Sequence, residues 1–435
     1  MFKYKPLAAA ILALVSIQAF ADDSTSNQTQ SGVENVAEVQ QNAAPTTAAQ
    51  NQTGTGNDAF ADQSDGTSVV TQTQNGEFNA STGVQGSDFG GQITHNQTGE
   101  WNAAHSEQWF NDASQTTVTQ DGNYNDAFSI QDSQIGSSVV INQVDSENIA
   151  SAEQLFGADN WTTIDQSGTG NESGTWQVDQ TGSLIGIQQS GELNISYVDQ
   201  SQGNGNRVDV LQTGEIGYIE VWQSDQEGGQ VSVEQGGGAL NEVVVDQSFG
   251  SNNLATVIQN GDTNAAWADQ YGATDSTTTL TQTGGGNFAL TYQEGERLGM
   301  TVTQSGDGNS VFASNWQGDP LGGQFGADQT VVLNQDGNGN TANFTQEGSF
   351  NELYFDQLGD DNTLTISQSD SNNLAEGLSE GIGNMTSITQ AGMYNITAIN
   401  QVGSDNQATV TQSSLNMNAN VNQTGTGNVA IVSQQ

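Results

Sequence analysis

Two histidines, His95 and His105, are the residues of this chain best suited to general acid–base chemistry. A histidine acts in catalysis only when the reacting group and an orienting partner lie within hydrogen-bond reach. Both lie in segments of alternating polarity. His95 takes the inward position that Val118 takes one repeat later, whereas His105 takes an outward position. We therefore expect the two imidazoles on opposite faces, and we predict no catalytic residue and no enzymatic activity.

Carboxylates are the second group of side chains that could bind a ligand or a metal, because the chain has 50 Asp and Glu against 4 Lys and Arg. It has no cysteine. A calcium-binding roll repeats Gly-Gly-x-Gly-x-Asp every nine residues, a period that this sequence lacks. The doublet Asp360-Asp361 and the glycine runs at 236–238 and 284–286 fall in expected turns, so they indicate neither a metal site nor a phosphate loop. We predict no cofactor, no dedicated metal and only diffuse binding of divalent cations. Nucleic acid is excluded as a partner because a polyanion is repelled.

The residues with regular spacing are amides, whose chemistry is hydrogen bonding. The phrase Gln-x-Gly-x-x-Asn-x-(small)-x-x-x-Gln occurs 18 times, at intervals of 22 to 24 residues apart from one interval of 31. Composition alone does not hold residues in phase over such a length, so the period indicates an ordered solenoid rather than disorder. The first residue of each copy is Gln30, Gln52, Gln74, Gln97, Gln120, Gln143, Gln166, Gln189, Gln212, Gln235, Gln259, Gln282, Gln304, Gln335, Gln357, Ser379, Gln401 or Gln423.

Short alternating segments must position these amides. In residues 406–412 the alternate positions read Asn, Ala, Val and Gln, and the positions between them are polar. Period-two alternation is typical of a strand with one buried face. The four residues between two such segments contain the glycine that a tight turn needs. One repeat therefore predicts one rung, made of a strand, a tight turn, a second strand and a looser turn.

Stacking these rungs predicts an all-β fold, a β-solenoid of about 18 two-strand rungs with a length of roughly 85 Å. Amides stacked in register can bond to the same residue one rung away, and a buried amide without a partner costs about 1–3 kcal/mol. The Ala, Val, Ile and Thr between them are expected to fill an interior too narrow for large side chains. The clearest ladder residues are Gln120, Asn125, Gln131, Gln166, Asn171, Gln177, Gln282, Asn287, Gln293, Gln401, Asn406 and Gln412, with turn glycines Gly122, Gly168, Gly284 and Gly403.

The two ends of the sequence pattern suggest the domain organisation. Residues 1–21 are expected to be a signal peptide, because Lys3 and Lys5 precede an apolar run too short to span a membrane. Residues 22–435 would then form the solenoid, and with two remaining arginines their formal charge is 2 − 50 = −48. The interval of 31 residues contains Pro320, so residues from about 316 to 327 are expected to form a loop insertion.

The phrase Ser-x5-Gln-x-Gly-x-x-Asn-x-Ala-x3-Gln strongly resembles the curlin repeat of curli fibres. It is complete at Ser276, Gln282, Gly284, Asn287, Ala289 and Gln293, and residues 114–131 match equally well. The resemblance implies a subunit that is secreted by a Gram-negative bacterium and that passes unfolded through a dedicated outer-membrane secretion and nucleation machinery. It further implies assembly at the cell surface into amyloid fibres that scaffold biofilm and promote adhesion. Typical curlins carry about five repeats, whereas this chain has 18 and is unusually acidic.

Self-association is thus the predicted interaction. A solenoid ends in unpaired backbone groups that template another strand, and no proline or charged plug follows residues 429–432. The alternative function is an ice-binding solenoid, although Thr is also a common residue of exposed strands. The outward tryptophans, with Phe128, Phe288 and Tyr292, either cover the sheets or mediate lateral association. The outward Thr-x-Thr pairs are Thr71/Thr73, Thr117/Thr119, Thr279/Thr281, Thr301/Thr303, Thr363/Thr365 and Thr409/Thr411.

Overall fold

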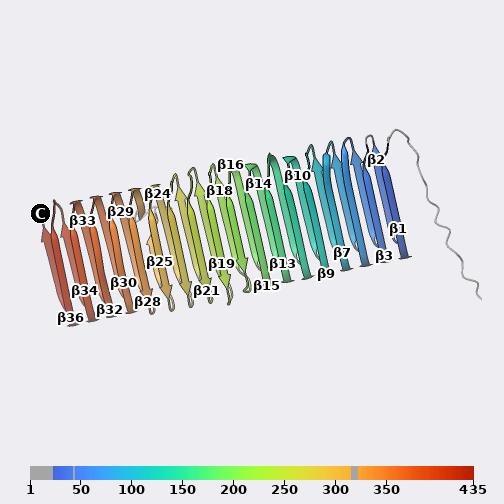
Figure 1. The fold of residues 1–435 in the computed structure, drawn as a ribbon. Coiled ribbons are helices and arrows are strands. Elements are labelled where there is room, and N and C mark those ends of the chain that lie inside the picture. Colours follow the sequence, from blue (N-terminus) through green and yellow to red (C-terminus); the bar gives the residue numbers. More distant parts are fainter. Residues whose placement is uncertain (1–22, 43–44, 315–321) are drawn as a thin grey trace, which may run out of the picture.

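The computed structural model describes residues 23–42, 45–314 and 322–435, so the expected signal peptide lies outside the described residues. Every described element is a β-strand, and the strands form one long rod that runs from β1 to β37 in chain order (Figure 1). Within the described ranges, no helix is long and apolar enough to cross a membrane. The predicted all-β solenoid is confirmed.

The strands divide into two parallel sheets, one from each half of the repeat. The first sheet has 18 strands over the described residues: β1 Thr25–Val33, β3 Thr47–Thr55, β5 Thr67–Glu77, β7 Phe89–Glu100, β9 Gln115–Asn123, β11 Ser138–Ser146, β13 Trp161–Thr169, β15 Leu184–Glu192, β17 Arg207–Gln212, β19 Gln230–Gly236, β21 Leu254–Asn260, β23 Thr277–Thr283, β25 Gly299–Ser305, β28 Thr330–Asp336, β30 Glu352–Asp360, β32 Leu374–Ile382, β34 Ile396–Ser404 and β36 Asn418–Thr426. The second sheet comprises β2 Val36–Asn42, β4 Asp58–Ser64, β6 Ala80–Gly86, β8 Ala103–Trp109, β10 Asp126–Ile135, β12 Ile149–Ala158, β14 Glu172–Thr181, β16 Ile195–Asn204, β18 Tyr218–Ser224, β20 Glu242–Ser248, β22 Ala265–Tyr271, β24 Phe288–Glu296, β26 Ser310–Ala313, β27 Gly323–Ala327, β29 Thr341–Ser349, β31 Thr363–Ser371, β33 Met385–Met393, β35 Gln407–Gln412 and β37 Val429–Gln434.

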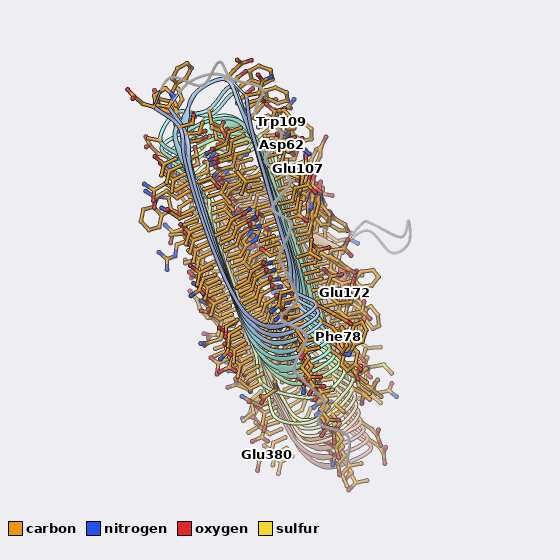
Figure 2. The ribbon with its side chains drawn as sticks, turned by 90° about the vertical axis from the view of Figure 1, so that its right-hand side faces the viewer. Asp62, Phe78, Glu107, Trp109, Glu172 and Glu380 are labelled. Atoms are coloured by element: carbon orange, nitrogen blue, oxygen red, sulfur yellow. The ribbon has the colours of Figure 1, made fainter. Side chains whose placement is uncertain are left out.

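Neighbouring strands pair in the register that the repeat dictates. In the first sheet Gln120 of β9 lies opposite Gln143 of β11, which lies opposite Gln166 of β13. Identical positions therefore stack into columns that run along the rod, and Figure 2 shows these columns filling the space between the two sheets and lining their outer sides. A slip by one residue would move a whole strand's buried set to the solvent face, which fixes the register.

Alternating burial explains why these segments are strands. In β13 the inward residues Thr162, Ile164 and Gln166 are buried, whereas the residues between them are half-buried. The strands are longer than the alternating segments alone, since β9 continues to Asn123 and β10 to Ile135. Pairing between rungs continues into the turns, because each turn also stacks on its counterpart.

The interior holds Ala, Val, Ile and Thr beside the amides, as expected, and it also holds Leu. The expectation that it excludes large side chains is wrong at two neighbouring rungs, where Phe344 and Phe355 are fully buried. Gly377 makes room for the second ring, because a Cβ on Gly377 would lie 2.5 Å from a ring carbon of Phe355. At Phe355 the narrow interior therefore admits an aromatic ring because the adjacent rung lacks a side chain.

The long interval divides one strand of the second sheet into two. Both β26 and β27 pair with β24 on one side and with β29 on the other, so together they occupy one rung. Residues 315–321, including Pro320, lie outside the described residues. The expected loop at 316–327 therefore differs from the structure at its C-terminal end, since Gly323–Ala327 form a paired strand.

Candidate functional site: the amide ladders and the ends of the rod

One glutamine column runs through the whole second sheet. From Gln41 to Gln434, each side chain donates its Nε2–H to Oε1 of the glutamine one rung toward the C-terminus, in 17 successive bonds of 2.7 to 3.1 Å. The predicted residues Gln131, Gln177 and Gln293 belong to it, as does Gln412. All of these amides point the same way, so the column has a direction.

A second glutamine column runs through the first sheet in the same direction. It contains 14 successive bonds of 2.7 to 3.0 Å between Gln30 and Gln357. At Ser379 a hydroxyl takes over and donates to Oε1 of Gln401 at 2.9 Å, and Gln401 donates onward to Gln423 at 2.9 Å. The predicted residues Gln120, Gln166, Gln282 and Gln401 lie in this column.

These glutamines also tie the two sheets together. Gln166 of β13 donates to the backbone oxygen of Ile149 at 2.9 Å and to that of Asn171 at 3.1 Å. The same Nε2 donates to Gln189 at 2.8 Å. One buried side chain thus bonds to groups on the first sheet, on the turn and on the second sheet. Moving this amide out of its position would break all three bonds and destabilise the fold.

The asparagine column runs the opposite way, at the turn between the two strands of a rung. Asn125 donates both its backbone N–H and its Nδ2–H to Oδ1 of Asn102, at 3.1 Å each, and so points toward the N-terminus. Its Nδ2 also donates to the backbone oxygen of Asp145 at 3.0 Å in the following rung. The predicted residues Asn171, Asn287 and Asn406 make the equivalent bonds to the preceding asparagine. Each asparagine therefore joins three consecutive rungs.

The turn glycines stand where two rungs approach most closely. Gly122, Gly168, Gly284 and Gly403 have φ angles of 147°, 96°, 110° and 126°. A Cβ on Gly168 would lie 2.1 Å from the backbone oxygen of Gly191, and at the other three positions the distance is 1.7 to 2.1 Å. Both the backbone conformation and the space require glycine here.

Two ladder features escaped prediction from sequence. Gln324 continues the glutamine column of the second sheet across the long interval, because it accepts from Gln293 and donates to Gln346. The signal was present, since Gln324 lies 11 residues before Gln335, the same spacing that separates Gln335 from Gln346 and Gln346 from Gln357. A third, short ladder joins Gln28, Gln50 and Gln72 near the N-terminal end. Its signal was the Gln-x-Gln pair in each of the first three repeats.

The histidines lie in one rung but on opposite faces, as expected. His95 is fully buried, its two ring nitrogens lie 2.9 Å and 2.7 Å from the hydroxyls of Ser81 and Ser106, and burial lowers its pKa to about 3. His105 lies on the outer face and contacts Glu107 at 2.8 Å. The lowered pKa keeps His95 neutral, and its two serine partners satisfy both ring nitrogens inside the rod. No group of three or more His, Asp or Glu in the described part of the chain could hold a metal ion.

Charge is nearly all of one sign on the outer surface. Arg207 is paired with Asp209, and Arg297 is paired with Glu296 and Asp328, so both arginines of the described chain are neutralised locally. Burial raises the pKa of several aspartates, and it raises that of Asp88 and that of Asp269 to about 7. The remaining acidic surface repels a second copy at low ionic strength.

The threonine pairs do not share one face. Thr71/Thr73, Thr117/Thr119, Thr279/Thr281 and Thr301/Thr303 lie in β5, β9, β23 and β25 of the first sheet. Thr363/Thr365 and Thr409/Thr411 lie in β31 and β35 of the second sheet. Only the pairs of β23 and β25 are on adjacent strands. A continuous hydroxyl array made of these pairs is therefore absent from the described strands.

The two ends of the rod carry complementary groups. At the N-terminal end, Oε1 of Gln30 and Oε1 of Gln41 accept no hydrogen bond from any described residue. At the C-terminal end, Nε2 of Gln423 and Nε2 of Gln434 each donate one bond, to the backbone oxygens of Gln407 and Asn418. Interior glutamines of the two columns also donate to the glutamine of the next rung, a bond that these two terminal amides do not make to any described residue.

Comparison with known families finds a match to a repeat family. The curlin-associated repeat matches residues 337–369 and 359–392, the part of the rod that contains β29 to β32. A search of curated protein sequences finds no significant match to the chain. The matched segment contains the ladder residues Gln346, Gln357 and Gln368, and its strands are continuous with the rest of both sheets.

Proposed function

We propose that this chain, a curlin-repeat protein, is a secreted structural subunit of an extracellular curli-like amyloid fibre. In this proposal subunits assemble end to end by β-strand stacking, and the fibre supports the biofilm matrix and cell adhesion. The observation that carries the proposal is the complementarity of the two ends of the rod. An open sheet edge is a liability in a soluble protein, whereas here it is the assembly surface.

The ladders specify how two copies would dock. Stacking β1 of one copy on β36 of another places Gln30 opposite Gln423, and the free Nε2–H of Gln423 then reaches Oε1 of Gln30. The second sheet adds the equivalent bond from Gln434 to Gln41. In the asparagine column, Asn35 of the incoming copy donates to Oδ1 of Asn428, in the direction of every earlier asparagine bond. All three columns are satisfied only in the head-to-tail arrangement, which generates an open filament.

The proposed cellular route follows from the expected signal peptide and from the family. The chain would leave a Gram-negative cell through a curli-type outer-membrane secretion and nucleation machinery, and would reach the cell surface as part of a pilus-like fibre. Export in an unfolded state suits a rod whose order comes from stacking of rungs, because each rung gains its partners only when its neighbour forms. Diffuse binding of divalent cations would screen the acidic coat during assembly.

The test is to purify the chain without residues 1–21 in denaturant, dilute it into buffer, and follow it by electron microscopy and fibre diffraction. The proposal predicts unbranched filaments with a reflection near roughly 4.7 Å along the fibre axis. Soluble rods that never elongate would contradict it. Thermal hysteresis in the same samples would instead favour the ice-binding alternative.

A further inference from the structure

The outer side of the second sheet contains a small cleft between two tryptophans. Trp176 of β14, Asp199 of β16 and Trp222 of β18 lie directly opposite one another on three consecutive strands. The cleft has a volume of about 270 Å³ and is lined by Trp176, Tyr197, Asp199, Glu220, Val221 and Trp222. The ring of Tyr197 lies 6.2 Å from that of Trp176 and forms a further wall. Figure 2 shows Glu172, of the same rung as Trp176, on the outer side of this sheet.

The base of the cleft is a carboxylate without a partner. Asp199 is half-buried, accepts no hydrogen bond from any described residue, and has a pKa raised by that burial. The neighbouring carboxylates are held in place, because Tyr218 donates its hydroxyl to Glu220 at 2.6 Å and Tyr197 donates to Glu172. The cleft thus combines the carboxylate of Asp199 with the fixed carboxylate of Glu220, and Glu172 lies outside its lining.

This arrangement suits a positive ligand. One strand, β16, lies between the strands of the two tryptophans, so the backbones of Trp176 and Trp222 are about 9.6 Å apart. Both indoles line the cleft around Asp199, and an aromatic face attracts a cation within about 6 Å of the ring. Neither arginine of the described chain can fill the cleft, because Arg207 and Arg297 are already paired elsewhere.

We propose that the cleft formed by Trp176, Asp199 and Trp222 binds an alkylammonium cation, with the two indoles as walls and the Asp199 carboxylate as counter-ion. A sugar is the less suitable ligand, because a half-buried carboxylate without a partner calls for a charge rather than a hydroxyl. The ammonium group has two possible sources, a quaternary ammonium or the primary amine of a lysine side chain. The site goes beyond the fibre function, since it lies on the side of the rod and not at its ends.

The test is titration of the mature chain with tetramethylammonium and with n-butylammonium at constant ionic strength, followed by ligand line broadening in proton NMR. We expect saturable binding of at least one ammonium, and the tighter of the two identifies the source. We further expect Asp199→Asn and Trp222→Ala each to weaken that binding by about tenfold. The neutral carbon analogue 3,3-dimethyl-1-butanol should bind at least about tenfold more weakly than tetramethylammonium.

A matched control exists in the same column. Asp62 of β4 takes the position of Asp199 and is also partly buried, but its neighbours along the column are Gln40 and Val84 instead of tryptophans. Asp62→Asn should leave ammonium binding unchanged. Equal losses in Asp62→Asn and Asp199→Asn would overturn the proposal by showing general charge screening. Equal binding of the neutral analogue, or binding of methyl glucoside without ammonium binding, would also overturn it.

Discussion

Gln412 donates its Nε2–H to Oε1 of Gln434 at 2.8 Å, and this bond points toward the C-terminus like every other bond of its column. The neighbouring asparagine column points the other way, since Asn428 donates to Oδ1 of Asn406 at 2.8 Å. The rod is therefore polar: glutamine acceptor oxygens at its N-terminal end and glutamine N–H groups at its C-terminal end bond to no glutamine side chain of the described ranges. Because of this polarity, head-to-tail stacking of two copies differs in energy from stacking of two N-terminal ends or of two C-terminal ends.

Removal of one ladder amide should destabilise the rod strongly. Gln189 is buried, accepts from Gln166 at 2.8 Å and donates to Gln212 at 2.7 Å. Gln189→Ala removes the acceptor that Gln166 uses in this column and leaves Oε1 of Gln212 without its donor in the interior, so we expect a loss of about 2–5 kcal/mol in denaturant unfolding followed by circular dichroism. The adjacent Gln188 is exposed, and Gln188→Ala should change stability by less than about 0.5 kcal/mol. Equal effects of the two substitutions would contradict the ladder as a stabilising element.

The loss of stability on replacing a turn glycine with alanine should depend on the space available to the new Cβ atom. Gly168→Ala drives a methyl group into the backbone oxygen of Gly191, and we expect it to cost at least about 3 kcal/mol. Gly182 also has a positive φ, of 63°, but nothing lies within 4 Å of its missing Cβ. Gly182→Ala should therefore cost only about 1–2 kcal/mol from backbone strain. The comparison uses thermal unfolding, and a Gly182→Ala variant as unstable as Gly168→Ala would argue against close stacking of the turns.

Stability should rise on mild acidification. The Asp88 carboxyl has a pKa of about 7 in the folded chain because of burial, against about 4 in an unfolded chain. The folded state binds this proton more tightly than the unfolded state does. The carboxyl therefore leaves the unfolding free energy unchanged below about pH 4 and lowers it progressively between about pH 4 and pH 7. Above about pH 7 the unfolding free energy stays lowered by a constant amount. Asp269 acts in the same direction. We expect the unfolding free energy to be about 2–4 kcal/mol greater at pH 5 than at pH 8.

Substitution of Asp88 separates this effect from general charge repulsion. Asp88→Asn removes the buried charge and should raise the unfolding free energy at pH 8 by about 2–4 kcal/mol while flattening the pH dependence. Asp112 of the next rung is exposed, and Asp112→Asn removes the same formal charge. If both variants responded alike, surface repulsion and not burial would be the cause.

Assembly should depend on ionic strength. Two copies that meet end to end each bring a strongly acidic coat, and the repulsion between them is screened within about 10 Å at 0.1 M salt. We expect slow growth in low salt at neutral pH, with a lag in thioflavin fluorescence that shortens on addition of NaCl, and more so with divalent cations at equal ionic strength. Kinetics that do not change with salt would remove charge repulsion as the barrier.

The repeat predicts the register of the rod because one spacing fixes every column. Once Gln120 lies opposite Gln143, the inward, outward and turn positions of the whole rung follow. The sequence cannot give the direction of the bonds, because an amide donates and accepts equally well at either side. The direction of the glutamine bonds is fixed only in the folded rod, where Nε2 of each glutamine must also reach a backbone oxygen, as Gln166 reaches that of Ile149.

Exceptions to the repeat were the least predictable features. Phe355 fits inside because Gly377 one rung away lacks a side chain, a compensation between two residues that the averaged phrase does not contain. Asp88 reads as an ordinary turn carboxylate, yet it is 1% exposed, and its Oδ1 accepts from the backbone N–H of Asn111 at 2.8 Å. The cleft at Asp199 likewise depends on which side chains lie opposite it on the two neighbouring strands. Those neighbours can be named only once the strand register is known.

The most direct measurement of head-to-tail docking is disulfide formation between two single-cysteine variants. In the docked register Thr29 lies opposite Asn422, both are exposed, and their Cα atoms would be about 4.8 Å apart, within disulfide range. Mixed and oxidised during assembly, Thr29→Cys and Asn422→Cys should give a cross-linked dimer, whereas Asn27→Cys with Asn422→Cys, at about 8 Å, should not. Cross-linking of Thr29→Cys with itself, or filaments without any bond between positions 29 and 422, would contradict the account.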